Sequence, residues 1–207
     1  MGETTGHPAA GDAGDDIVVD RLGGLGSARA AQIRGLIRDV PDYPHPPVVF
    51  RDITPLLADG AALADVVEAF AGLVQADHGG SGGVDVVAGM EARGFLLGAP
   101  LATRLGVGFL PLRKAGKLPP PVERVDYELE YGSAAIELRT GTLEAGARVL
   151  LVDDVLATGG TARAAAQLVE RAGGHVVALA FLLELVGLQG RDMLAGRAVE
   201  ALLRVES

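Results

Sequence analysis

The sequence of 207 residues contains no cysteine, and it has no excess of positive charge. Without cysteine the chain can form no disulfide, offer no thiolate to a metal and use no thiol as a nucleophile. Its 27 acidic and 18 basic residues give a formal net charge of -9. Because sequence-independent binding to nucleic acid needs a basic surface, we expect no nucleic-acid partner.

Long hydrophobic runs are also missing. No apolar run approaches the roughly twenty residues of a membrane span, and the N-terminus is acidic where a signal peptide is basic. We therefore expect a cytoplasmic protein with no membrane partner. No Walker sequence is present, so nucleotide hydrolysis has no support.

The apolar residues that are present favour a single α/β domain. They make up 49% of the chain, which is enough for one substantial core. Strand-like runs at 84–90, 107–112, 147–154 and 175–185 alternate with alanine-rich helical stretches, a pattern typical of a mostly parallel central sheet flanked by helices. We expect residues 1–20 to be a disordered acidic tail and residues 21–207 to form the domain.

The first elements are predicted from caps and prolines. Ser27 is a candidate N-cap for a helix running to about Asp39, with its apolar residues on one face. The proline cluster at 41–47 ends that helix and leads an extended chain into residues 48–50. A second helix is expected over 61–76, followed by a strand over 84–88.

Residues 113–125 interrupt the pattern with four cations and three consecutive prolines. This composition predicts a long mobile loop, and lysine and arginine beside glycine suggest a flap that closes over an anion. A solvated charged loop is the alternative. Residues 127–138 alternate as strands do, so a flap at about 113–132 forms part of a hairpin-like excursion from the sheet.

Two adjacent carboxylates, Asp153 and Asp154, follow the predicted central strand 147–152. After them come Thr158, Gly159 and Gly160, and then a predicted helix over 161–171. Glycines at the start of a helix let backbone N–H groups approach a phosphate. Carboxylates repel phosphate but suit a sugar diol or a magnesium ion. The expected ligand is therefore a sugar phosphate.

The stretch VLLVDDVLATGGTA, residues 149–162, resembles the phosphoribosyl pyrophosphate motif of the type I phosphoribosyltransferases. Four further stretches, at 41–57, 88–102, 110–119 and 127–132, are similar to the adenine-specific branch of that family. The resemblance covers about residues 28–190. It implies the type I phosphoribosyltransferase fold with a flap and a small hood, and a Mg²⁺-dependent homodimer of purine salvage. The implied reaction transfers the phosphoribosyl group to adenine, giving AMP and pyrophosphate.

The resemblance also implies roles for single residues. Arg93 and Lys114 would bind the diphosphate, with Lys117 and Tyr131 on the flap and Glu130 as the carrier of the adenine proton. Asp153 and Asp154 would meet magnesium mostly through substrate and water. The phosphoribosyl pyrophosphate site as a whole would comprise Arg93, Lys114, Asp153, Asp154, Ala157, Thr158, Gly159, Gly160 and Thr161.

Adenine would lie against a second group of residues. Val49 would offer its backbone groups, Phe50 and Arg51 belong to the same stretch, and Leu183 would pack against the other face of the base. Two alternatives remain open. One is a transferase of the same fold acting on xanthine, hypoxanthine or orotate. The other is a non-catalytic regulator that senses phosphoribosyl pyrophosphate, although the sequence offers no room for the DNA-binding domain that such regulators commonly carry.

Overall fold

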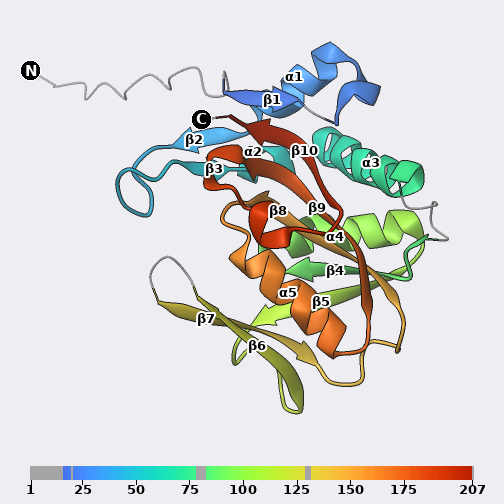
Figure 1. Ribbon diagram of the computed structural model, residues 1–207. Coiled ribbons are helices and arrows are strands. Elements are labelled where there is room, and N and C mark those ends of the chain that lie inside the picture. Colours follow the sequence, from blue (N-terminus) through green and yellow to red (C-terminus); the bar gives the residue numbers. More distant parts are fainter. Residues whose placement is uncertain (1–15, 20, 78–82, 129–131, 207) are drawn as a thin grey trace, which may run out of the picture.

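The computed structural model describes residues 16–19, 21–77, 83–128 and 132–206. Within them an eight-stranded sheet has the order β1-β10-β9-β8-β4-β5-β7-β6 (Figure 1). The five central strands pair in parallel, namely β4 (Val86–Met90), β5 (Gly108–Lys114), β8 (Arg148–Leu156), β9 (His175–Leu185) and β10 (Val199–Val205). Antiparallel strands complete both edges, namely β1 (Ile17–Val19), β6 (Val122–Glu128) and β7 (Ser133–Arg139). The predicted mostly parallel sheet is confirmed.

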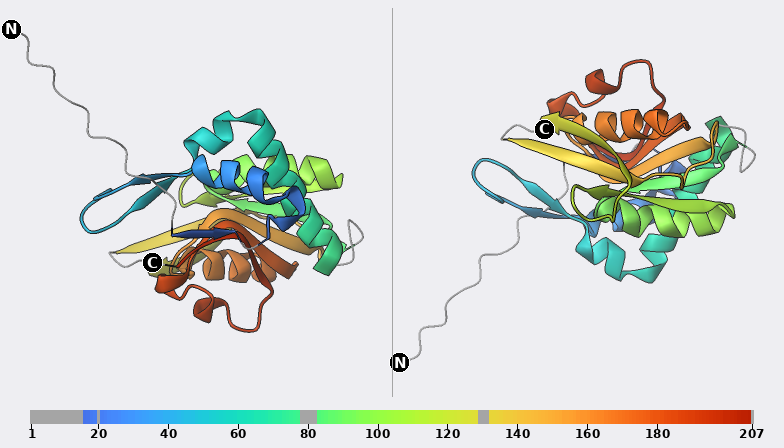
Figure 2. Two further views of the ribbon diagram at one scale, coloured as in Figure 1. Left: turned by 90° about the horizontal axis from the view of Figure 1, so that it is seen from above. Right: turned by 90° about the horizontal axis from the view of Figure 1, so that it is seen from below.

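Helices cover both faces of the sheet, as the two views of Figure 2 show. On one face lie α1 (Ser27–Gly35), α3 (Gly60–Asp77) and α4 (Arg93–Leu105), and on the other lies α5 (Gly160–Arg171). Successive side chains of β8 point to opposite faces of the sheet. Leu150 and Val152 pack in the core under α1, α3 and α4, whereas Val149 and Leu151 pack in the core under α5. Two cores on one sheet hold the carboxyl ends of β4 and β8 side by side.

A two-stranded hairpin forms the hood beside this edge. It consists of β2 (Arg38–Val40) and β3 (Phe50–Asp52), paired antiparallel, and α2 (Thr54–Ala58) follows it. The predicted helix to Asp39 is therefore too long, because the chain leaves the helix after Gly35 and pairs with β3. The predicted N-cap is also wrong: Gly26 takes the cap position, and no side chain caps the helix.

The N-terminal boundary also differs from the prediction. Ile17–Val19 form a strand against β10, and Ile17 is only 1% exposed. The expected tail of 1–20 is wrong over these residues, because pairing with a strand nearly two hundred positions away leaves no local signal. Residues 1–15 and 20 lie outside the described residues.

The flap has more regular structure than its composition predicts. β5 continues through Lys114 and β6 begins at Val122, so the predicted loop over 113–125 shrinks to residues 115–121. Val125 is buried in the core that contains α5, and β6 pairs with β7 along its whole length. The long loop is corrected and the hairpin-like excursion is confirmed. In the described part of the chain, no helix is long and apolar enough to cross a membrane.

Candidate active site

The two carboxylates lie on a strand and not in the loop after it. β8 runs through Asp153 and Asp154 to Leu156, four residues beyond the predicted end at Val152. Pairing with β4 stops at Val152, whereas pairing with β9 continues to Leu156. The acid pair therefore occupies the part of β8 where one neighbouring strand has ended. Adjacent strand residues point to opposite faces, so one carboxylate serves each side of this edge.

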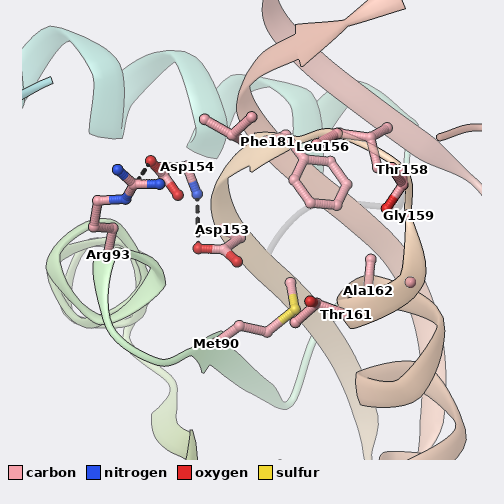
Figure 3. A pocket seen from close by; sticks show the side chains of 13 residues that line it. Met90, Arg93, Asp153, Asp154, Leu156, Thr158, Gly159, Thr161, Ala162 and Phe181 are labelled. Atoms are coloured by element: carbon pink, nitrogen blue, oxygen red, sulfur yellow. Dashed lines mark hydrogen bonds and ion pairs between the residues drawn. The ribbon is translucent and has the colours of Figure 1, made fainter. Parts of the chain in front are cut away.

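Asp154 faces α4, where it meets Arg93 (Figure 3). Its side chain is almost completely buried, and Arg93 Nε lies 2.7 Å from Oδ2 in an ion pair. Burial raises the pKa of Asp154, and the positive charge of Arg93 offsets that rise only in part. No described group gives this oxygen a hydrogen bond of good geometry. This oxygen can therefore accept a hydrogen bond from a ligand or coordinate a cation.

Asp153 lies on the other side of the strand and lines the cavity. Its Oδ1 accepts a hydrogen bond of 2.9 Å from the backbone N–H of Asp154. Desolvation raises the pKa of Asp153 well above its usual value, and the neighbouring charge of Asp154 adds to the rise. Two carboxylates at one edge thus carry a free-energy cost that a bound cation would relieve.

The loop after β8 forms a phosphate cradle that carries no charged side chain. Gly159 has φ of 81°, in the left-handed region that favours glycine, and α5 begins at Gly160 with no side-chain cap. The first N–H groups of α5 therefore remain available to an anion. The hydroxyl of Thr161 lies 3.3 Å from that of Tyr127 on β6.

Acid pair and loop together surround a cavity of about 210 Å³. Its lining comes from β4, β8 and β9, from the loop after β8 and from the first residues of α4 and α5: Met90, Arg93, Asp153, Asp154, Val155, Leu156, Ala157, Thr158, Gly159, Gly160, Thr161, Ala162 and Phe181. The structure thus brings together eight of the nine residues predicted for phosphoribosyl pyrophosphate.

The ninth, Lys114, lines an adjoining cavity of about 290 Å³ that shares Asp153 and Thr161 with the first. The carboxylate of Glu91 fixes this end of β5, accepting hydrogen bonds from Lys114 N–H at 2.7 Å and Arg113 Nε at 3.1 Å. Partial burial would raise the pKa of Glu91, but these two bonds and the nearby positive charges hold it below its usual value. The ammonium group of Lys114 is therefore carried on an anchored backbone.

A second loop, between β4 and α4, stands opposite the phosphate cradle. The peptide bond from Glu91 to Ala92 is cis, and Arg93 is the first residue of α4. Gly94 allows this turn to lie against β8, because a Cβ there would come within 2.6 Å of the carbonyl oxygen of Val152. Two helix N-termini therefore converge on the acid pair from both sides.

The residues predicted for adenine lie in different environments. The guanidinium of Arg93 stacks over the ring of half-buried Phe50 at 5.0 Å, and Tyr43 meets that ring edge-on at 5.3 Å. The side chain of Arg51 instead turns inward, where its two terminal nitrogens pair with Asp16 at 2.6 Å and with Asp39. Its guanidinium ties the N-terminal segment to the hood.

The remaining residues predicted for the site either do not line the cavity or lie outside the residues that the structure describes. Val49 is exposed and directly precedes β3, and Lys117 is exposed in the flap turn. Leu183 is fully buried in the core and does not line the cavity. Phe181, the register partner of Asp153, lines it instead. Glu130 and Tyr131 lie outside the described residues.

The donor set fits a magnesium ion that is held mainly by its ligand. Among the described residues, no group of three or more His, Asp or Glu side chains could hold a metal. Among the described residues that line the first cavity, only Asp153 and Asp154 carry carboxylates, and one of their oxygens is buried without a hydrogen bond. Magnesium commonly keeps several waters and takes one or two carboxylates together with substrate phosphates. The residues present suit that arrangement.

Comparison with known proteins agrees with this geometry. Residues 53–193 match the family model described as phosphoribosyl transferase domain. The adenine phosphoribosyltransferase of Kineococcus radiotolerans is 62% identical over 173 residues, spanning 84% of this chain and 91% of the relative. The chain belongs to the adenine phosphoribosyltransferase family. The member from Methylococcus capsulatus is 54% identical and is covered over 98% of its length.

Solved adenine phosphoribosyltransferases share the fold. The crystal structure from Thermoanaerobacter pseudethanolicus has a TM-score of 0.79 at 45% identity, covering 84% of this chain and 98% of that one. The structure from Saccharomyces cerevisiae, crystallised with an imino-altritol bisphosphate and adenine, has a TM-score of 0.79 at 36% identity with the same coverage. The predicted family and the type I phosphoribosyltransferase fold are confirmed.

Proposed function

We propose that the protein transfers the phosphoribosyl group of 5-phosphoribosyl 1-pyrophosphate to adenine, giving AMP and pyrophosphate, as a step of purine salvage. The observation that carries this proposal is the convergence of two helix N-termini on one acid pair. Each helix start favours an anion, and the carboxylates between them suit a diol or a cation. A ribose with a phosphate at one end and a diphosphate at the other matches that order of groups.

The 5-phosphate would bind the cradle formed by Ala157, Thr158, Gly159, Gly160 and Thr161. Free N–H groups at the start of α5 would donate to its oxygens, and the threonine hydroxyls would add donors. Asp153 and Asp154 would accept hydrogen bonds from the ribose hydroxyls. This arrangement fixes the sugar while its first carbon stays accessible, which is the positional contribution that a displacement at that carbon requires.

The diphosphate would bind between Arg93 and Lys114. Arg93 would leave Asp154 and donate to the diphosphate oxygens, so a guanidinium that now balances a carboxylate would balance the leaving group. We propose that Asp153 and Asp154 hold Mg²⁺ mostly through substrate and water. When bound there, the ion would neutralise charge that builds up on the departing diphosphate. Lys114 would add charge from the flap.

Adenine would stack in the slot next to Phe50, with the backbone of Val49 reading its edge. The ring of Phe50 already carries the guanidinium of Arg93, so base and diphosphate would share one neighbour. Arg51 would contribute by holding β3 in place, through its pairs with Asp16 and Asp39. Proton transfer by Glu130 and closure by Lys117 and Tyr131 stay predictions. The predicted packing of Leu183 against the base is not part of the proposal, because Leu183 is fully buried in the core.

We also propose that the protein works as a homodimer in the cytoplasm. The support for both the dimer and the compartment is the family resemblance. The side chains described above already form a connected site within one chain. Sedimentation of the purified protein across a range of concentrations tests the assembly, and a single species at the mass of one chain would contradict it.

The test of the reaction is pyrophosphate release by the purified protein with phosphoribosyl pyrophosphate and Mg²⁺. Adenine, hypoxanthine, guanine, xanthine and orotate are compared side by side. We expect release with adenine alone. Release with another base would retain the fold and the acid pair but overturn the proposed base slot. No pyrophosphate release with any of the five bases, despite binding of phosphoribosyl pyrophosphate, would favour the sensing regulator.

A further inference from the structure

The segment that follows β9 packs directly against the back of the phosphate cradle. We call residues 186–194 the backing segment; it contains the short helices η3 (Val186–Leu188) and η4 (Asp192–Leu194). A Cβ added to Gly190 would lie 2.2 Å from the carbonyl oxygen of Ala157. Conversely, a Cβ added to Gly159 would lie 2.4 Å from the carbonyl oxygen of Gly190. The two backbones therefore touch with no room for a side chain between them.

A charge cluster around one buried carboxylate holds the backing segment to the sheet. Glu184 on β9 is only 4% exposed. It accepts hydrogen bonds from Nε of Arg191 at 2.6 Å and from Nη2 at 2.8 Å. The remaining terminal nitrogen of Arg191 donates to the carbonyl oxygen of Val199 at 2.7 Å. Arg204 on β10 adds its Nε at 3.7 Å from the same carboxylate. The planar guanidinium of Arg191 thus links β9, β10 and the backing segment.

The position of this cluster relates it to the ligand. Glu184 is the register partner of Leu156, the last residue of β8 before the cradle begins. The cluster and the cradle therefore start from neighbouring positions on adjacent strands. The cradle has no charged side chain of its own, so its grip on a phosphate depends on where its backbone N–H groups point. A segment that packs against the cradle and holds its backbone in place therefore also fixes the directions of these N–H groups.

We propose that Gly190, Glu184 and Arg191 are positioning residues for the ligand's 5-phosphate, acting through the backbone of the cradle. The inference rests on the proposed function, because it concerns ligands that carry this phosphate. Stability alone is a weak reason for such a cluster, because the buried carboxylate of Glu184 pays a desolvation cost while the side chain of its partner Arg191 stays 41% exposed. Fixed orientation of the donors is the gain that a phosphate site can use.

The cluster and the diphosphate site should therefore respond differently to substitution. Gly190→Ala forces the cradle away from its position, and we expect the dissociation constant of AMP to rise about 100-fold. Glu184→Gln keeps the shape but leaves two arginines without their carboxylate, and we expect a rise of about tenfold. Arg191→Lys keeps the charge but loses the paired hydrogen bonds of the guanidinium to Glu184, so we expect a rise similar to that of Glu184→Gln. Pyrophosphate, which binds near Arg93, should keep its affinity in all three variants.

Matched controls separate positioning from general loss of stability. Asp85→Asn breaks another forked pair, with Arg148 at 2.7 and 3.0 Å, at the opposite end of β8. Gly72→Ala adds a methyl group on α3 where nothing lies within 4 Å. Both controls should bind AMP as the unchanged protein does.

The experiment is calorimetric titration of the full chain with AMP and, separately, with magnesium pyrophosphate. Loss of AMP affinity with retained pyrophosphate affinity supports the inference. Equal loss of both ligands, or unchanged AMP binding by the folded Glu184→Gln protein, would overturn it. The unchanged protein is the reference: if it binds no AMP, the proposed function fails, whereas normal binding there and in every variant overturns the positioning role alone.

Discussion

The two loops that we propose to bind anions differ in the groups that they offer to a ligand. Both follow a buried parallel strand and both open a helix, one at Gly160 and the other at Arg93. The cradle after β8 is neutral, glycine-rich and pressed from behind by the backing segment. The loop after β4 instead presents one strong cation, which is paired with Asp154 and 38% exposed.

The difference between the two loops matches what happens to the 5-phosphate and to the diphosphate in the proposed reaction. The 5-phosphate is present in substrate and product alike, so a rigid backbone site suits it throughout. The diphosphate must be bound and then released, which suits a side chain with an alternative partner to return to. Asp154 is that partner for Arg93. A fixed site and an exchangeable site thus lie on either side of one acid pair.

The largest expected effect comes from removing the exchangeable cation. Arg93→Ala should lower kcat/KM about 1000-fold, because the charge that meets the leaving diphosphate is lost. Steady-state pyrophosphate release with adenine measures it. Arg104→Ala, at the other end of α4 in an exposed pair with Glu68, is the control and should change little. A fall of less than tenfold for Arg93→Ala would contradict the proposed role.

Removing the alternative partner should have the next largest effect. Asp154→Asn leaves the fold intact but loses the charge that meets Mg²⁺ and the ribose, so the KM for phosphoribosyl pyrophosphate should rise about 30-fold. Initial rates at low concentrations of this substrate measure the change. Unchanged rates there would count against the interpretation of the acid pair.

A smaller effect is expected from the fixed site. Thr161→Val keeps the shape of the helix start and removes one hydroxyl donor, so AMP should bind about tenfold more weakly. Titration with AMP measures it, and Thr103→Val on α4, whose hydroxyl donates to its own helix at 3.1 Å, is the control. Binding of pyrophosphate should not change, and a parallel loss of both ligands would argue against separate sites.

The smallest effect concerns stability and its dependence on pH. The pKa of Asp153 is raised in the folded protein by desolvation and by Asp154. The folded state therefore holds this proton more tightly, and stability falls as pH rises from the unfolded pKa through the folded one. At pH 7, Asp153→Asn should be more stable by about 1 kcal/mol, with the gain vanishing near about pH 4.

Thermal unfolding at several pH values tests this difference, and the control has the opposite sign. Hydrogen bonds from the side chain and backbone of Arg148 lower the pKa of Asp85 to about 2. Asp85→Asn should therefore lose stability at neutral pH, and that loss should shrink as pH falls toward 2. A less stable Asp153→Asn protein at pH 7 would contradict the cost assigned to the acid pair.

The cradle was predictable from the sequence because its chemistry is contiguous. Asp153, Asp154 and the glycines that follow lie within one short stretch between an apolar run and a helix. The rules for helix starts and for strand ends apply to neighbours in the chain, so this motif predicts its own geometry. The parallel sheet was predictable for the same reason, from alternating apolar runs.

What sequence reasoning missed depends on contacts between distant residues. Arg51 was expected at the base, yet it pairs with Asp16, 35 positions away. The strand Ile17–Val19 exists through β10, and β8 extends past Val152 because β9 continues beside it. Tertiary pairing of this kind overrides local propensity. Tyr127 and Phe181, which line the cavities, carry no local signal that separates them from core aromatics.

In the proposed mechanism one anion site is fixed and the other is exchangeable, and one cross-titration tests this division most directly. AMP and magnesium pyrophosphate are each titrated into the unchanged protein, Arg93→Ala and Thr161→Val. We predict that Arg93→Ala weakens pyrophosphate far more than AMP and that Thr161→Val does the reverse. Two variants that weaken both ligands in the same proportion would contradict the division.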